Sequence, residues 1–162
     1  MNRFTIKELP LKGLLEIRQT PIIDNRGFLS RLFCKDEFSE FGFKSEISQI
    51  NHTHTKEAGS IRGMHFQYPP ATESKLVTCL KGAVFDVAVD IRKGSPTFLE
   101  WHAIELSFDK HNALLIPKGF AHGFQTLVKD VELLYFHDHE YNNVLESGLN
   151  PHDPSIKIKW PK

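Results

Sequence analysis

The amino-acid sequence predicts an all-β domain, a sandwich or small barrel with one or two short helices. Short stretches rich in β-branched and aromatic residues recur at near-regular spacing along the chain. Turn signals such as KG, KD and RKGSP separate them, and a single stretch has the spacing of a helix. The 162 residues suit one domain, residues 1–162, which can bury most of its apolar surface in one core.

The helix is expected over residues 35–43, KDEFSEFGF, because Phe38 and Phe41 lie three residues apart and Gly42 is suited to end it. Six strands then follow in chain order. They are expected at KLVTCL (75–80), AVFDVAVDI (83–91), EWHAIEL (100–106), NALLIP (112–117), GFQTLV (123–128) and VELLYF (131–136).

The strand expected over residues 83–91 has two unlike faces. Alternation places an apolar row, residues 85, 87, 89 and 91, on one face. Asp86 and Asp90 lie among small residues on the other face. These aspartates either line a polar lumen or face solvent, and the pattern alone leaves both interpretations open.

Composition and charge exclude several classes of function. Twenty basic residues balance twenty acidic ones, so bulk charge favours neither nucleic acid nor a membrane surface as partner. The start lacks the apolar segment of a signal peptide, and no apolar run approaches the ~20 residues of a membrane-spanning helix. Cys34 and Cys79 form no CxxC motif, which argues against a disulfide framework or zinc knuckle. We therefore expect a cytoplasmic protein with reduced thiols.

Three groups of histidines are candidates for chemistry: His52 with His54, then His65, and then His122. The first and the third group raise a metal hypothesis. His52 and His54 in QINHTHTKE share a face if this stretch is a strand. His122 ends the segment PKGFAH, which has the P-x-G-x-x-H form of the second cupin motif. With Glu57 these histidines would make a 3-His-1-carboxylate metal site. The H-x-H-x-x-E spacing is one residue short of the usual pattern, which favours isolated, hydrogen-bonded histidines.

The second group raises an acid–base hypothesis. His65 in IRGMHFQYPP follows Arg62 and precedes Lys75 by ten residues. Two cations beside a neutral imidazole suit an anionic substrate that gains charge during reaction. The structural alternative is a surface strand with alternating polar residues. Tyr135, at the end of an apolar strand, is either a half-buried proton donor or a structural tyrosine bonded to a carbonyl.

Five segments in order resemble one family, the dTDP-4-dehydrorhamnose 3,5-epimerases. They are RGMHFQ, KLV, FDVAVDIRKGSPTF, IPKGFAHGF and ELLY, and the resemblance extends from Asp24 to Pro161. It implies a cupin-type jelly roll that forms a homodimer and works without metal or other cofactor. It also implies a nucleotide-diphosphate-4-keto-6-deoxy sugar as substrate. Such an enzyme inverts C3, C5 or both, by removing the proton beside the C4 ketone and returning one on the opposite face.

The resemblance also implies roles for individual residues. His65 matches the general base, Tyr135 the opposite-face acid, and Lys75 the lysine at the C4 oxygen. The implied substrate-binding residues are Arg62 and Arg26 for the diphosphate (Arg26 reaching across the dimer), Gln49 and Asn51 for the sugar and nucleotide, His122 with its acidic partner Asp86, and Tyr141 on the nucleotide side.

The sequence departs from the family at three places. The family commonly continues beyond KIKWP with an aspartate that hydrogen-bonds the base. We therefore expect Asp86, Glu73 or solvent to orient His65 here. Arg31 stands where an acidic or amide residue is common near the nucleotide base, which leaves CDP- and GDP-linked sugars as alternatives to dTDP. Residues 136–138, FHD, replace lysine and small residues, which favours inversion at one carbon. A metal-dependent cupin and a non-catalytic nucleotide-sugar-binding cupin remain alternative functions.

Overall fold

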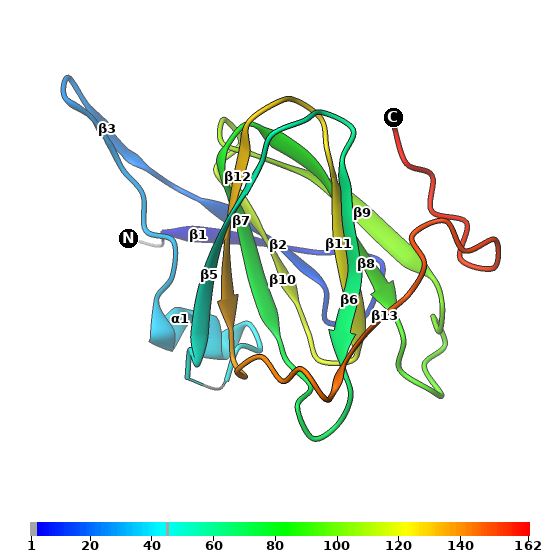
Figure 1. The fold of residues 1–162 in the computed structure, drawn as a ribbon. Coiled ribbons are helices and arrows are strands. Elements are labelled where there is room, and N and C mark those ends of the chain that lie inside the picture. Colours follow the sequence, from blue (N-terminus) through cyan, green and yellow to red (C-terminus); the bar gives the residue numbers. More distant parts are fainter. Residues whose placement is uncertain (1–2, 45) are drawn as a thin grey trace.

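A computed structural model describes residues 3–44 and 46–162, and it shows two antiparallel sheets packed face to face (Figure 1). The six-stranded sheet contains, in spatial order, β1 (Phe4–Glu8), β2 (Leu15–Gln19), β10 (Asn112–Ile116), β7 (Lys75–Lys81), β12 (Val131–His137) and β5 (Gln49–Thr55). The five-stranded sheet contains β13 (Glu146–Gly148), β6 (Ile61–Gln67), β11 (Phe120–Thr126), β8 (Ala83–Asp90) and β9 (Trp101–Ser107). This is a cupin-type jelly roll, and the expected fold class is confirmed.

The six expected strands are present as β7 to β12, with ends shifted by up to three residues. The sequence patterns did not indicate the strands between Phe4 and Leu29, or β13. The expected helix is also present, as α1 (Lys35–Glu40). It ends before Gly42, which has a positive φ of 103°, and it buries Phe38 completely.

Each large sheet buries apolar side chains on both of its faces. Between the sheets, β7, β10 and β12 pack against β8 and β11 through a core that includes Leu114, Leu133 and Phe124. Helix α1 covers the outer face of the six-stranded sheet, where Phe38 packs beside Leu76. The C-terminal segment covers the outer face of the five-stranded sheet. There Ile156 packs with the apolar row of β8.

The two aspartates of β8 are both fully buried, so the interpretation that they face solvent is wrong. Asp86 points between the sheets, on the face that also presents Ala88 to the core. Asp90 accepts hydrogen bonds from Arg92, Ser95 and Thr97. It therefore fixes the turn that follows β8, and those donors hold the pKa of its carboxyl below the ordinary value despite burial.

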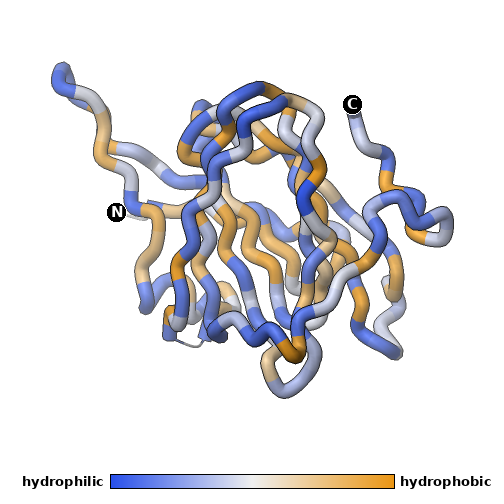
Figure 2. The backbone as a smooth tube through the Cα atoms, in the orientation of Figure 1, coloured by the Kyte–Doolittle hydropathy of each residue, from blue (hydrophilic) through white to orange (hydrophobic). Residues whose placement is uncertain are grey.

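A hairpin of β3 (Ile22–Asp24) and β4 (Gly27–Leu29) projects from the body of the molecule (Figure 1). Its arms are partly apolar, as the orange stretches in Figure 2 show. Four large apolar side chains on it are exposed, namely Ile22, Ile23, Phe28 and Leu29.

The described residues contain no helix of the length and apolarity needed to cross a membrane. Cys34 and Cys79 are both free thiols.

Candidate active site

A cavity of about 190 Å³ opens between the two sheets. Strands β5, β7 and β12 form one wall, and β6 and β11 form the other. The loop after β12, together with β13, closes one side. The lining residues are Gln49, Asn51, Thr53, Arg62, His65, Phe66, Gln67, Glu73, Lys75, His122, Phe124, Tyr135, His137, Tyr141 and Glu146.

Strand register decides which side chains share the first wall. On neighbouring antiparallel strands, residues directly opposite each other point to the same face. His137 lies opposite both Lys75 and Gln49, and two residues back along β12 Tyr135 lies opposite Asn51. The polar residues of three strands therefore form one continuous surface toward the cavity.

A bulge in β6 brings Arg62 and His65 to the same side of the second wall. Residues three apart on a regular strand point to opposite faces. Between His122 and Phe124 of β11, however, β6 contains one extra residue. Gly63 provides it with φ of 129°, and a Cβ there would lie 2.5 Å from the Cα of Gly123. Glycine is therefore required at this position for the approach of the two strands.

His65 has a carboxylate neighbour that the sequence analysis did not identify. Its Nδ1 lies 3.5 Å from Oε1 of Glu146, and the other oxygen of Glu146 accepts a hydrogen bond of 2.6 Å from the Tyr141 hydroxyl. The expected orienting groups Asp86 and Glu73 are engaged elsewhere, Asp86 with His122 and Glu73 with His137 and Lys75, so Glu146 is the carboxylate beside His65.

The surroundings of His65 favour the neutral imidazole. Partial withdrawal from water lowers its pKa below the ordinary 6.5, and the positive charges of Lys75 and Arg62 act in the same direction. Glu146 opposes them by stabilising the imidazolium. A neutral ring at neutral pH is the form that accepts a proton.

Tyr135 faces the cavity from the opposite sheet and is almost entirely buried. Burial raises the pKa of its phenol well above the ordinary value of 10, and the negative charge of Asp86 adds to this effect. Its ring meets that of His122 edge-on, with centroids 6.0 Å apart. The hydroxyl is therefore protonated throughout the neutral range and able to donate.

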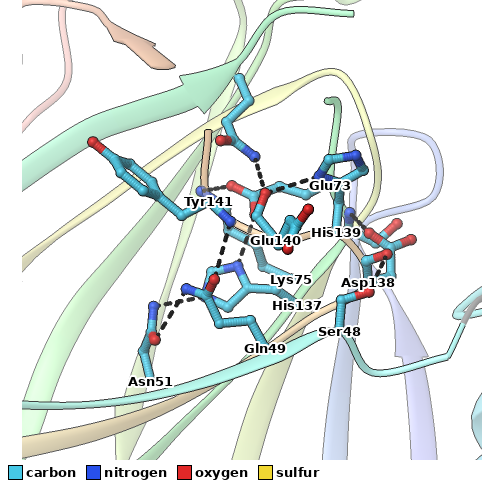
Figure 3. Close-up of polar contacts among 12 residues, drawn as sticks. Ser48, Gln49, Asn51, Glu73, Lys75, His137, Asp138, His139, Glu140 and Tyr141 are labelled. Carbon is cyan, nitrogen blue, oxygen red and sulfur yellow. Dashed lines mark hydrogen bonds and ion pairs between the residues drawn. The ribbon is translucent and has the colours of Figure 1, made fainter. Parts of the chain in front are cut away.

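Lys75 is the buried cation of the site, and it belongs to a polar chain drawn in Figure 3. Its Nζ lies 3.0 Å from one oxygen of Glu73, whose other oxygen lies 2.9 Å from Nδ1 of His137. From His137 the chain continues through Asn51 and Gln49 to the backbone N–H of Tyr141.

His122 lines the cavity and forms a buried pair with Asp86 behind it, with Nε2 and Oδ1 2.8 Å apart. The other carboxylate oxygen of Asp86 is buried without a hydrogen-bond partner among the described residues. A buried oxygen without a partner costs free energy, so the hydrogen bond to His122 is the main polar compensation for burying this carboxylate.

Comparison with known proteins decides the family. A family profile described as dTDP-4-dehydrorhamnose 3,5-epimerase matches residues 8–162. The chain belongs to this family. An enzyme of that name from Shigella flexneri is 45% identical over 139 residues, which is 85% of this chain and 76% of the relative. The expectation of a nucleotide-sugar epimerase is confirmed.

Solved structures of the epimerase family agree closely with the fold. The Bacillus anthracis enzyme with TDP and PPi bound has a TM-score of 0.94 and 38% identity, covering 98% of this chain and 90% of that one. The Legionella pneumophila enzyme in complex with dTDP-4-keto-L-rhamnose also has a TM-score of 0.94, with 36% identity and coverage of 98% and 84%.

Two of the residues that the epimerase resemblance indicated do not line this cavity. Asp86 lies beneath it, behind His122. Arg26 lies at the tip of the projecting hairpin, where its guanidinium pairs with Asp24 at 2.6 Å. Arg31, the departure expected near the nucleotide, pairs instead with Glu37 of α1 at 3.6 Å and does not line the cavity.

The histidines of the metal hypothesis do not lie together at one site. His52 and His54 share a face of β5 as expected, but it is the outer face, where they pair with Glu132 and Asp130. His122 faces the interior. Within residues 3–44 and 46–162, no cluster of three or more His, Cys, Asp or Glu side chains is arranged to hold a metal ion.

Sequence reasoning missed several lining residues. Thr53 continues the alternation of Gln49 and Asn51 along β5, so strand periodicity contained the signal. Glu146 lies on a three-residue strand that pairs with β6, and no local pattern distinguishes it. Phe66, Gln67 and Phe124 also went unassigned.

Proposed function

We propose that the protein, with residues 1–162 as one jelly-roll epimerase domain, inverts C3, C5 or both in a nucleotide-diphosphate-linked 4-keto-6-deoxy sugar. The observation that carries the proposal is the placement of a base and an acid on facing sheets. His65 on β6 and Tyr135 on β12 approach the same cavity from opposite walls. A sugar carbon held between them can lose a proton to one face and gain one on the other.

Lys75 supplies the electrostatic part of this reaction. Removing a hydrogen beside a ketone leaves negative charge on the ketone oxygen, and a preorganised cation lowers that barrier in a site with little water. The ammonium shares its charge with Glu73 in the free protein. The Lys75 ammonium therefore requires no external counter-ion before the enolate forms.

The diphosphate is assigned to Arg62, whose guanidinium lines the cavity. Among the described residues, its side chain donates a single long hydrogen bond, of 3.4 Å to Thr55. Tyr141 and the amides of Gln49 and Asn51 are assigned to the nucleotide and sugar. Binding energy from this remote group holds the sugar between base and acid. The nucleotide is proposed as dTDP, by analogy with the relatives. The two free thiols fit the expected cytoplasmic location.

The direct test is incubation of the protein in D₂O with dTDP-, CDP- and GDP-linked 4-keto-6-deoxyhexoses, followed by NMR at C3 and C5. Deuterium uptake with inversion at either centre is expected for one nucleotide, and a chelator should leave the rate unchanged. Binding without uptake would instead indicate the non-catalytic sugar-binding function. Loss of uptake on chelation would indicate a metal enzyme.

We also propose that the protein is a homodimer in which Arg26 of the hairpin reaches the partner's cavity. The exposed apolar arms of the hairpin support this, because residues such as Ile23 and Leu29 gain from burial against a second copy. Ile23→Asp with Leu29→Asp is expected to shift the mass in light scattering from dimer to monomer. A wild-type monomer at micromolar concentration would contradict the dimer and the role of Arg26.

The pH dependence of the reaction tests the base and its carboxylate together. His65 works only when neutral, so kcat/KM should fall as the pH drops through its lowered pKa, below the ordinary 6.5. Glu146→Gln removes the group that raises this pKa, so the acid limb of the profile should move to still lower pH. A matched control is Glu105→Gln, which removes a carboxylate paired with Lys110 outside the cavity. An unmoved acid limb in Glu146→Gln would separate Glu146 from the base.

A further inference from the structure

His137 occupies the junction of the polar chain without an assigned role. It lies on the same face of β12 as Tyr135, and only 8% of the residue is exposed. The two rings stack, with centroids 6.0 Å apart and planes 13° from parallel. Its Nδ1 lies 2.9 Å from Glu73, and its Nε2 lies 3.5 Å from the amide nitrogen of Asn51.

The hydrogen-bond chain determines the tautomer of this imidazole. The backbone N–H of Tyr141 is an unambiguous donor, and it reaches the side-chain oxygen of Gln49 at 3.0 Å. The amide nitrogen of Gln49 must then donate to the oxygen of Asn51. This leaves the NH₂ group of Asn51 facing Nε2 of His137 at 3.5 Å, an arrangement that favours Nε2 as the acceptor.

Nδ1 of His137 therefore carries a proton that is directed at the carboxylate of Glu73. The carboxylate of Glu73 is held by two donors, one oxygen by His137 and the other by Lys75. A carboxylate held at both oxygens has little rotational freedom. Consequently, the position of the Lys75 ammonium depends on the His137 ring.

We infer that His137 is a positioning residue for both halves of the reaction: through Glu73 it fixes the Lys75 ammonium, and by stacking it fixes the Tyr135 ring. This inference rests on the proposed function. The two roles act at different steps, because Lys75 stabilises the enolate and Tyr135 reprotonates it. Variants that remove one role at a time should therefore differ in which quantity changes, the rate of deuterium uptake or the fraction of uptake that ends in inversion.

His137→Phe keeps a planar ring beside Tyr135 and removes both hydrogen bonds. Freed from one donor, Glu73 should hold Lys75 less precisely, so deuterium uptake should slow about tenfold, the effect of one lost hydrogen bond to a charged group. The fraction of uptake that ends in inversion should be unchanged. KM should also change little, since the nucleotide contacts remain.

His137→Asn keeps a donor near the position of Nδ1 and removes the stacking ring. Deuterium uptake should stay within about threefold of wild type, because one preserved hydrogen bond accounts for most of the tenfold effect. The ratio of uptake to inversion should rise, since an unsupported Tyr135 delivers its proton less often. His139→Phe and His139→Asn are matched controls, because that ring lies outside the cavity lining and its one hydrogen bond among the described residues is to the carbonyl of Glu140.

The tautomer provides a readout independent of turnover. Nitrogen-15 NMR of the imidazoles in the wild-type protein should show His137 with a protonated Nδ1 and a bare Nε2, and the opposite tautomer would overturn the inference. If the wild type takes up deuterium and both His137 variants keep its rates and its ratio of uptake to inversion, the role of His137 is overturned. The proposed function would then stand. No uptake by the wild type from any of the sugars would overturn the proposed function and this role with it.

Discussion

His65→Asn is expected to lower the rate of deuterium uptake from D₂O by about 10²–10⁴-fold, the contribution of a positioned general base. Asparagine approximates the shape of the first part of the imidazole but has no basic nitrogen. The loss should appear in kcat, because His65 is proposed to act on the sugar carbon, whereas Arg62 and Tyr141 are assigned to the diphosphate and nucleotide. The measurement is single-turnover NMR of the labelled sugar.

The same substitution at His52 is the matched control. His52 lies on the outer face of β5, pairs with Glu132 and does not contact the cavity. His52→Asn should therefore keep the wild-type rate. Binding of the free nucleoside diphosphate, measured by calorimetry, should be preserved in both variants. Near-normal uptake by His65→Asn would show that another group removes the proton.

Much of the fold could be predicted because strand patterning is local. The alternation of β8 and the apolar run of β12 are each visible within nine residues, and so is the Phe38–Phe41 spacing that predicts α1. The short strands at the N-terminus carry weaker signals. The hairpin of β3 and β4 exposes every residue of its strands, so no burial pattern marks it.

The site was less predictable, because it depends on register between distant strands. Lys75 and His137 lie 62 positions apart in the sequence and become neighbours only through the β7–β12 pairing. The bulge at Gly63 reverses the expected alternation between Arg62 and His65. Glu146 reaches His65 only because the chain after β12 returns to pair with β6, and no periodicity within the segment predicts such a return.

Tyr135→Phe is expected to separate exchange from inversion. If His65 removes the proton and Tyr135 returns one from the other sheet, the phenol is needed only after the enolate has formed. The base, the Lys75 ammonium and the stacking contact with His137 all remain in the variant. Deuterium uptake should therefore continue, while inversion should fall about 10²–10⁴-fold, the usual contribution of a positioned proton donor.

The product of this variant should be labelled substrate of unchanged configuration, because His65 returns a solvent-derived deuteron to the face from which it took the proton. NMR of the recovered sugar follows label and configuration separately. Tyr68→Phe is the control, since that half-exposed ring lies outside the cavity and should leave both rates at wild-type values.

Other outcomes would reassign the acid. Equal loss of uptake and inversion would mean that the Tyr135 hydroxyl acts before or during enolisation. Full retention of inversion would mean that another group donates the proton. His122 is then the next candidate, because its ring meets that of Tyr135 edge-on and lines the same cavity. Tyr135→Phe combined with His122→Asn would then abolish the inversion that either single variant retains.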